Sequence, residues 1–266
     1  GLVGSEMCIR DRDEMKRLRA YVNEHLWDER TAFLYDRYGD GTLCTTKGIG
    51  AFWALQADAL DRERLDRMVA HLSDTTEFDR PHRVPSLSAD HPKYNPLGRY
   101  WQGGVWPGTN YMTIDGLYRK GYHDLAREIA ANHYAAVFEV WKNTGTFWEY
   151  YAPEKIEPGF MARKDFVGWT GLPPIAVFIE YILGVKSDYS EGRIVWDIEH
   201  TEVHGIERYP YGPDGVVGLK VKRRVSAGET PSVSVETNVP FDLTVTWGDG
   251  RSRTVRVEKS GSVKLN

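Results

Sequence analysis

The sequence is poor in cysteine, in charge of one sign and in long apolar runs, and each shortage excludes a class of protein. Its two cysteines, Cys8 and Cys44, are too few for a disulfide framework or a cysteine-based zinc site. No apolar run approaches the roughly 18 residues of a membrane-spanning helix, so we expect no membrane partner. A net charge of −4 gives no basic surface, so we expect no nucleic-acid partner. We interpret the short basic run 220–224 as a solvated strand edge.

Signatures of cofactor chemistry are also absent. The sequence has no phosphate-binding loop, no dinucleotide-binding glycine pattern and no Gly-x-Ser-x-Gly turn. His200 and His204 fall on one face of an expected strand, but no carboxylate or cysteine accompanies them to complete a metal site. We therefore expect neither a cofactor nor a bound metal.

Residues 1–12 lack the features of a signal peptide, because they have neither a charged start nor an apolar stretch. They also lack an initiating methionine, and they are similar to translated sequencing-adapter sequence. We therefore expect a non-native tail, with the natural chain extending upstream of residue 13; an ordinary disordered tail is the alternative. Without a targeting sequence, we expect a cytoplasmic protein.

Apolar spacings of three and four residues predict a mainly α-helical part over residues 13–185. Six helices are expected, at 13–26, 48–60, 62–72, 107–120, 122–142 and 169–183. Trp53, in the second helix, is expected in the core. The last helix is apolar nearly all round, which predicts burial on every side. A proline-rich loop spans residues 73–98, and ordered loops of that length are usually functional.

The pattern changes near residue 186, where we place a domain boundary. Short alternating segments follow, separated by turns such as Gly248-Asp249-Gly250. Strands are expected at 193–196, 216–221, 233–236, 241–247 and 254–257. Several short strands at close spacing predict a small antiparallel β-sandwich over residues 186–266.

The sequence is rich in aromatic rings, with nine tryptophans and 15 tyrosines. One carboxylate, Glu149, is flanked by four of these rings: Phe147, Trp148, Tyr150 and Tyr151. Glutamates usually lie on solvated helix faces, so this setting predicts a carboxylate in an aromatic cleft, where rings stack on sugars. Inverting glycoside hydrolysis uses two carboxyl groups about 6.5–9.5 Å apart, one as acid and one as the base that activates water. Glu149 is the candidate base.

Several motifs together resemble one family. Residues 100–107 (YWQGGVWP) resemble the Tyr-Trp-Arg-Gly-Pro-Val-Trp-Pro motif of glycoside hydrolase family 63 and the related mannosylglycerate hydrolases, and more distantly a trehalase motif. Residues 147–151 (FWEYY) resemble the family's Glu-x-Tyr segment, which carries the general base. Residues 166–170 (FVGWT) resemble its Phe-x-Trp-Thr segment, and residues 84–88 (VPSLS) resemble the loop before the first motif. The order and spacing agree over about residues 13–185.

The resemblance implies an (α/α)6 toroid, an inverting mechanism and Glu149 as the general base. It also implies that the partner is a small carbohydrate, either an α-glucoside or a mannosyl- or glucosyl-glycerate. The residues expected to bind this substrate are Tyr100, Trp101, Gln102, Trp106, Trp148, Tyr150 and Trp169.

Two departures from the family pattern matter. Gln102 stands where the family usually has arginine. The family's general acid is an aspartate in an upstream Gly-x-Asp-x-Ser motif, which is missing here; Asp28, Asp36 and Asp40 do not carry it. Six helices are also half of a twelve-helix toroid. We therefore expect the C-terminal half of a catalytic domain, missing its N-terminal half, inactive alone and with an exposed apolar face.

Other interpretations stay open. Glu149 could instead be a hydrogen-bonded structural group, and Trp101 or Trp106 could pack in the core. The aromatic cleft could bind sugar without cleaving it, as a carbohydrate-binding or structural segment would. An (α/α)6 isomerase or epimerase is disfavoured, because such enzymes rely on histidine pairs and none is expected near the aromatic motifs.

Overall fold

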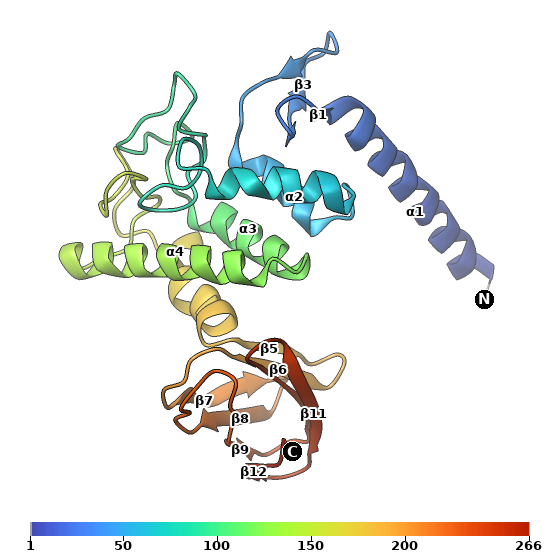
Figure 1. Ribbon diagram of the computed structural model, residues 1–266, viewed down its shortest axis with the longest axis vertical. Coiled ribbons are helices and arrows are strands. Elements are labelled where there is room, and N and C mark those ends of the chain that lie inside the picture. The colour runs from blue at the N-terminus through green and yellow to red at the C-terminus, as the bar shows by residue number, and fades with distance from the viewer. Residues whose placement is uncertain (1, 266) are drawn as a thin grey trace. The chain divides into compact units, whose positions relative to one another are not determined.

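The computed structural model describes residues 2–265, with side chains from residue 10 onward. The chain divides into two compact units between Pro174 and Ile175. The first unit is built mainly from helices and the second mainly from strands, which confirms the expected order of a helical part followed by a β part (Figure 1). Among the helices described between residues 2 and 265, none combines the length and apolarity needed to cross a membrane.

Within residues 2–174, the helical unit contains four α-helices, several 3-10 or π-helical turns and two short hairpins. The α-helices are α1 (Leu2–Tyr21), α2 (Arg62–Ala70), α3 (Pro107–Arg119) and α4 (His123–Thr144). The turns are η1 (Val22–Leu26), η2 (Ile49–Gln56), η3 (His71–Ser73) and η4 (Trp169–Gly171). The hairpins pair β1 (Trp27–Asp28) with β2 (Phe33–Leu34) and β3 (Asp36–Arg37) with β4 (Leu43–Cys44).

Local sequence explains where three of these helices begin or end. The Asp61 carboxylate accepts a hydrogen bond from the Arg64 amide and caps α2. Pro107 occupies the first turn of α3, where its missing N–H costs nothing. Gly145, at φ +73°, ends α4 in the left-handed conformation that glycine adopts most easily. The helices predicted at 62–72, 107–120 and 122–142 are therefore confirmed.

α1 covers both the helix predicted at 13–26 and the preceding tail. The helix begins at Leu2 and continues into η1. The backbone of residues 2–12 is therefore helical, and the non-native origin of this segment stays a prediction.

The helix predicted at 48–60 is instead the shorter 3-10 helix η2. Ile49, Phe52 and Leu55 are buried as expected, but the chain becomes extended at Ala57. Trp53 is 46% exposed, so its expected place in the core was wrong. The reason is periodicity: the buried residues recur every three positions along η2, and Trp53 falls between them.

The long loop expected at 73–98 is confirmed and extends to α3. Between η3 and α3 the structure describes no helix or regular strand, only isolated bridges such as Gly48 with Leu87. This loop carries residues 84–88 and 100–106 to the site described below.

The second unit begins with the π-helix η5 (Pro173–Ile182), which spans the division between the units. The sequence predicts the domain boundary near residue 186, whereas the structure divides the chain at residue 174, because most of η5 groups with the strands that follow it. Ile179 packs against the core of the strands. Ile175 and Phe178 are 62% and 36% exposed, so burial on every side was wrong.

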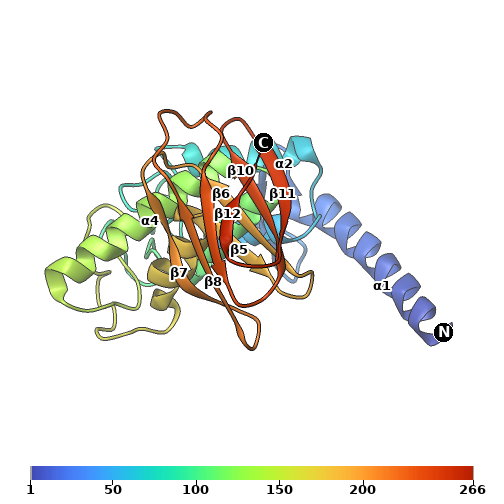
Figure 2. The ribbon, with the colours of Figure 1, turned by 90° about the horizontal axis from the view of Figure 1, so that it is seen from below.

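The strands of this unit form two four-stranded sheets (Figure 2). They are β5 (Val185–Asp188), β6 (Arg193–Ile198), β7 (His204–Tyr211), β8 (Gly215–Val221), β9 (Val233–Thr237), β10 (Phe241–Trp247), β11 (Arg251–Val257) and β12 (Gly261–Val263). The strand orders are β11-β10-β6-β5 and β12-β9-β8-β7. Alternate residues of β8 and β10 are buried in one core around Trp196, as the period of two requires. The five predicted strands are confirmed, but β6 and β10 pair in parallel rather than antiparallel.

The basic run 220–224 is solvated at Lys220, Lys222 and Arg223, as expected, but it is not at a sheet edge and Arg224 is buried. β8 lies inside its sheet, between β9 and β7. Arg224 is only 4% exposed, and its guanidinium donates to four carbonyl groups, two of them on Ile198 and His200. Arginine is buried here because its fixed fork of donors satisfies several main-chain oxygens at once.

Candidate functional site

Five aromatic rings from three distant segments meet in the helical unit. We call them the aromatic cluster: Tyr100, Trp101, Trp106, Tyr150 and Trp169. Trp106 lies at the centre, stacked on Trp101 and on Tyr150 with ring centroids 4.5 Å apart in each pair. Tyr100 packs edge-on against it at 5.0 Å, and Trp169 lies at 5.6 Å. The structure thus brings together five of the seven predicted substrate-binding residues.

The cluster has a buried base and an open rim. Trp106 and Tyr150 are 4% and 2% exposed, whereas Tyr100, Trp101 and Trp169 are 55%, 48% and 40% exposed. Large exposed rings held by buried rings present flat apolar faces to solvent. This arrangement suits stacking against the apolar face of a sugar.

The loop that carries Tyr100 and Trp106 is fixed by its own backbone. The Tyr100 carbonyl accepts from the Gly104 amide (3.0 Å) and from the Trp106 indole Nε1 (3.2 Å). A side chain at Gly104 would place its Cβ 2.4 Å from that carbonyl oxygen, so only glycine fits. Ser86, from the VPSLS segment, accepts a hydrogen bond from the Gly103 amide through its Oγ. Its own amide donates to the Gly104 carbonyl at 3.0 Å.

Asn110 anchors the same region from inside. It is fully buried on α3, where its Oδ1 accepts from the Val84 amide at 2.7 Å. Its Nδ2 donates to the carbonyls of Val84 (3.1 Å) and Trp106 (3.0 Å). One side chain therefore ties the loop before the aromatic motif to the start of α3.

Glu149 lies beside the cluster, on a bend between two isolated β-bridges. Val105 and Tyr151 form an antiparallel bridge, and so do Trp148 and Lys164. The Glu149 amide donates to the Arg163 carbonyl at 3.0 Å. The Tyr150 carbonyl accepts from the Gly159 amide at 3.0 Å, so both neighbours of Glu149 on the chain, Trp148 and Tyr150, are held by main-chain pairing.

The Glu149 carboxylate is partly exposed, and within residues 10–265 it has no hydrogen bond or ion pair. Burial, followed by the negative charge of Glu149, raises the pKa of the Tyr150 phenol. The carboxylate therefore lies close enough to Tyr150 for its charge to be felt there. An unpaired carboxylate beside open rings is free to bind and activate a water molecule.

The remaining two predicted substrate-binding residues, Trp148 and Gln102, are not among the five rings of the aromatic cluster. Trp148 packs against a core of Val105, Val137, Val140 and Tyr151, and its Nε1 donates to Thr144 Oγ1 at 3.1 Å. Gln102 lies in the loop, with its backbone bonded to Arg99 and Asn95. Its side-chain amide has no partner in the described part of the chain, so it can bond a ligand.

Residues 8–166 match a model of one family, the mannosylglycerate hydrolase MGH1-like glycoside hydrolase domain. This chain belongs to that family. Its members are O-glycosidases, as residues 100–107 and 147–151 indicated.

Named relatives of this chain differ in their substrates. A probable mannosyl-oligosaccharide glucosidase of Schizosaccharomyces pombe is 30% identical, covering 60% of this chain and 22% of its own length. A mannosylglycerate hydrolase of Rubrobacter radiotolerans is 29% identical, covering 60% and 35%. Neutral trehalase Nth1 of Saccharomyces cerevisiae shares the fold with a TM-score of 0.51 at 16% identity, over 61% of this chain and 29% of that one. The chain spans less than half the length of the curated relatives it matches.

The helical unit also has a buried histidine pair that the sequence did not suggest. His82 and His133 are both fully buried, and His82 Nε2 lies 2.9 Å from His133 Nδ1. The His82 ring packs on the Tyr151 ring, with centroids 5.6 Å apart. The expectation that no histidine pair lies near the aromatic motifs was therefore wrong. The two residues are far apart in sequence, so no local spacing pointed to them.

This pair has no access to a substrate, but it makes stability depend on pH. Burial lowers the pKa of His133 to about 3, and burial with the neighbouring ring lowers that of His82 well below its ordinary value. Unfolded histidines bind protons below about pH 6.5, whereas these two stay neutral when folded. Stability is therefore present above that pH and falls as the pH drops toward the folded-state values, by about 2 kcal/mol per histidine at pH 5.

We expect the double variant His82→Gln/His133→Asn to flatten this dependence. Glutamine and asparagine place an amide near the bonded Nε2 and Nδ1 atoms, respectively, but do not titrate. Urea unfolding at pH 7 and pH 5 should show a large drop for the wild type and a small one for the variant. Equal drops would show that the histidines do not control the pH dependence.

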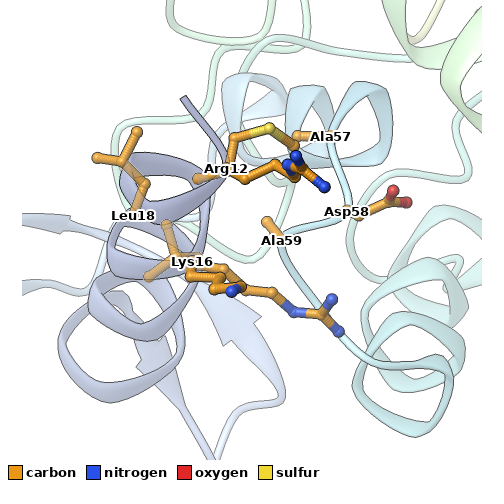
Figure 3. Close-up of a pocket in the computed structure, with 9 residues that line it drawn as sticks. Arg12, Lys16, Leu18, Ala57, Asp58 and Ala59 are labelled. Carbon is orange, nitrogen blue, oxygen red and sulfur yellow. The ribbon is translucent and has the colours of Figure 1, made fainter. Parts of the chain in front are cut away.

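A second hollow lies on α1, away from the aromatic cluster. It has a volume of about 400 Å³, and Figure 3 shows α1 facing the turn at residues 57–59 across it. Its lining comprises Arg12, Met15, Lys16, Leu18, Arg19, Val22, Ala57, Asp58 and Ala59. Its lining has no aromatic ring and only one carboxylate, Asp58, so it does not suit sugar chemistry.

The two histidines considered as metal ligands, His200 and His204, pack edge-on against each other. Among the residues that the structure describes, no group of three His, Cys, Asp or Glu side chains could hold a metal ion.

Proposed function

We propose that this protein is an inverting glycoside hydrolase in which Glu149 is the general base. The observation that carries the proposal is the unpaired Glu149 carboxylate, held by the backbone at the edge of the half-exposed aromatic cluster. A base of this kind removes a proton from water as the water attacks the anomeric carbon. The substrate class is an α-glucoside or a mannosyl- or glucosyl-glycerate, in line with the names of the relatives.

The cluster residues take different roles in this proposal. Tyr100, Trp101 and Trp169 offer exposed faces or edges to the sugar, and Gln102 offers its amide to a hydroxyl. Trp106 and Tyr150 support them from below. Trp148 does not contact the sugar in this proposal, because its indole packs against the core beside Val137 and Val140.

The second carboxyl group would come from a part of the enzyme outside these 266 residues. This part of the proposal is supported by the chain's coverage of less than half of its relatives, and by the exposed apolar residues Met15, Leu18 and Trp53. In this interpretation the helical unit is half of an (α/α)6 toroid, and the two sheets form a β-sandwich appendage. The present chain alone would then be inactive on natural glycosides. A cytoplasmic location stays a prediction.

The test is the stereochemistry of hydrolysis by the longer enzyme that contains these residues. We expect α-linked mannosylglycerate, glucosylglycerate or an α-glucoside to release the β-anomer of the sugar first, as seen by proton NMR before mutarotation. Release of the α-anomer would contradict an inverting mechanism. Absence of hydrolysis across all three substrates would contradict the substrate class.

The alternative is a segment that binds carbohydrate without cleaving it. The open rim of Tyr100, Trp101 and Trp169 favours it, because stacking needs no second carboxyl group. In that case calorimetry would detect sugar binding to the chain, while the longer protein would show no hydrolysis. Hydrolysis by the longer protein would exclude this alternative.

A further inference from the structure

Two successive side chains on one turn bind two successive carbonyl groups of the segment that carries Glu149. The Trp169 indole Nε1 donates to the Glu149 carbonyl oxygen at 2.8 Å. The Thr170 hydroxyl donates to the Trp148 carbonyl oxygen at 2.7 Å. Thr170 is fully buried, so water cannot take the place of its hydroxyl.

Together with the Arg163 carbonyl, these bonds fix the backbone on both sides of the Glu149 side chain. The amide of Glu149 is bonded to Arg163, and its carbonyl is bonded to Trp169. With both peptide planes held, the direction of the bond from Cα to Cβ is also held. The position of the carboxylate then depends only on the torsion angles of the Glu149 side chain.

Trp169 is itself held in place from several sides. Its ring lies 4.9 Å from the Phe166 ring and 5.6 Å from the Trp106 ring, centroid to centroid. At Gly108, on α3, even an added Cβ would lie 3.5 Å from the Trp169 Cβ, so α3 passes close beside it. The indole donor is therefore not a freely rotating surface group, although one side of the ring is open.

We propose that Trp169 and Thr170 form a clamp that positions Glu149 through its main chain. This inference rests on the proposed function, because it assumes that Glu149 is the base. It separates two roles for Trp169: its N–H orients the base, whereas its ring face is open for stacking. The clamp residues are positioning residues, since their bonds reach the protein backbone.

The chain itself offers a first test by indole hydrogen exchange. Trp169 and Trp101 are similarly exposed, at 40% and 48%, but only the Trp169 indole N–H has a hydrogen-bond partner among residues 10–265. In ¹⁵N-resolved NMR we expect the Trp169 indole proton to exchange at least ~10-fold more slowly than that of Trp101. Equal exchange rates would overturn the clamp.

The longer enzyme offers a kinetic test. Replacement of Trp169 by β-(3-benzothienyl)alanine keeps the bicyclic ring but exchanges the N–H for sulfur. We expect kcat to fall about 10- to 100-fold with little change in KM, because misplacing a catalytic group by about 1 Å costs about that much. The same replacement at Trp141 is the matched control and should change neither constant, because this residue of α4 is also 40% exposed but lies outside the aromatic cluster. A rise in KM with unchanged kcat would mean that Trp169 only stacks, and the clamp would be rejected.

Substitutions of Thr170 in the longer enzyme give an independent kinetic test. Thr170→Val keeps the shape of the side chain but removes the hydroxyl, so kcat should fall, as it does in the Trp169 variant. Thr170→Ser keeps the hydroxyl and should have nearly wild-type kcat. If the serine variant does not recover kcat, the hydroxyl is not what matters and the clamp fails. The proposed function fails separately: Glu149→Gln retaining turnover would move the base elsewhere. Loss of activity in Glu149→Gln, with full kcat in both clamp variants, would reject the clamp alone.

Discussion

Replacing Glu149 by glutamine is expected to lower kcat of the longer enzyme roughly 1,000-fold, with KM changed little. The amide has nearly the shape of the carboxylate but cannot accept a proton from the attacking water. General-base catalysis contributes about 10²–10⁴-fold, so its loss should fall in that range. Because the Glu149 carboxylate has no partner among residues 10–265, the substitution breaks no ion pair and should leave folding intact. Steady-state hydrolysis of the natural glycoside measures the effect.

Glycosyl fluorides separate the base from the acid in this experiment. Fluoride leaves without protonation, so these substrates need a base but no general acid. Glu149→Gln should therefore be impaired on both the glycoside and the α-fluoride. Glu157→Gln is the matched control, since this exposed glutamate lies on the following loop, and it should retain full turnover. A Glu149 variant that keeps more than about a tenth of wild-type kcat would show that the base is another residue.

Periodicity in the sequence was enough to predict most of the regular elements. The helices α2 and α4 have apolar residues at helical spacing, and Pro107 marks the start of α3. Alternation in β8 and β10 predicted two strands of the second unit. The parallel pairing of β6 with β10 joins strands distant in sequence, and no local pattern encodes it.

Whether each predicted ring lies in the aromatic cluster or in the core depends on the direction in which its side chain points. On the segment 148–151, Trp148 and Tyr151 share one core, while Tyr150 stacks on Trp106. Composition predicts that the segment is aromatic, but it does not determine which rings face the core. Trp101 and Trp106 show the same limit, because they stack on each other with one open and one buried.

Replacing Asn110 by alanine is expected to destabilise the helical unit by about 3 kcal/mol. The Asn110 amide makes three hydrogen bonds, to the Val84 amide, the Val84 carbonyl and the Trp106 carbonyl, and it is fully buried. Alanine leaves the Val84 amide and carbonyl without a partner in a place that water does not reach, whereas the Trp106 carbonyl keeps its bond from the Thr109 hydroxyl. Each buried unsatisfied group costs about 1–3 kcal/mol, so their sum, after partial relaxation, gives the expected value. Urea unfolding followed by tryptophan fluorescence measures it.

Asn132 provides a matched comparison, because it makes the same kind of bond one residue earlier in the loop. Its Oδ1 accepts from the Arg83 amide at 2.9 Å and its Nδ2 donates to the Pro81 carbonyl at 3.0 Å. Asn132 is only partly buried, so water can replace its amide in Asn132→Ala. We expect that variant to lose about 1 kcal/mol, well below the loss for Asn110→Ala. Equal losses would mean that burial of the amide does not set the cost, and that Asn110 does not anchor the loop leading to the aromatic cluster.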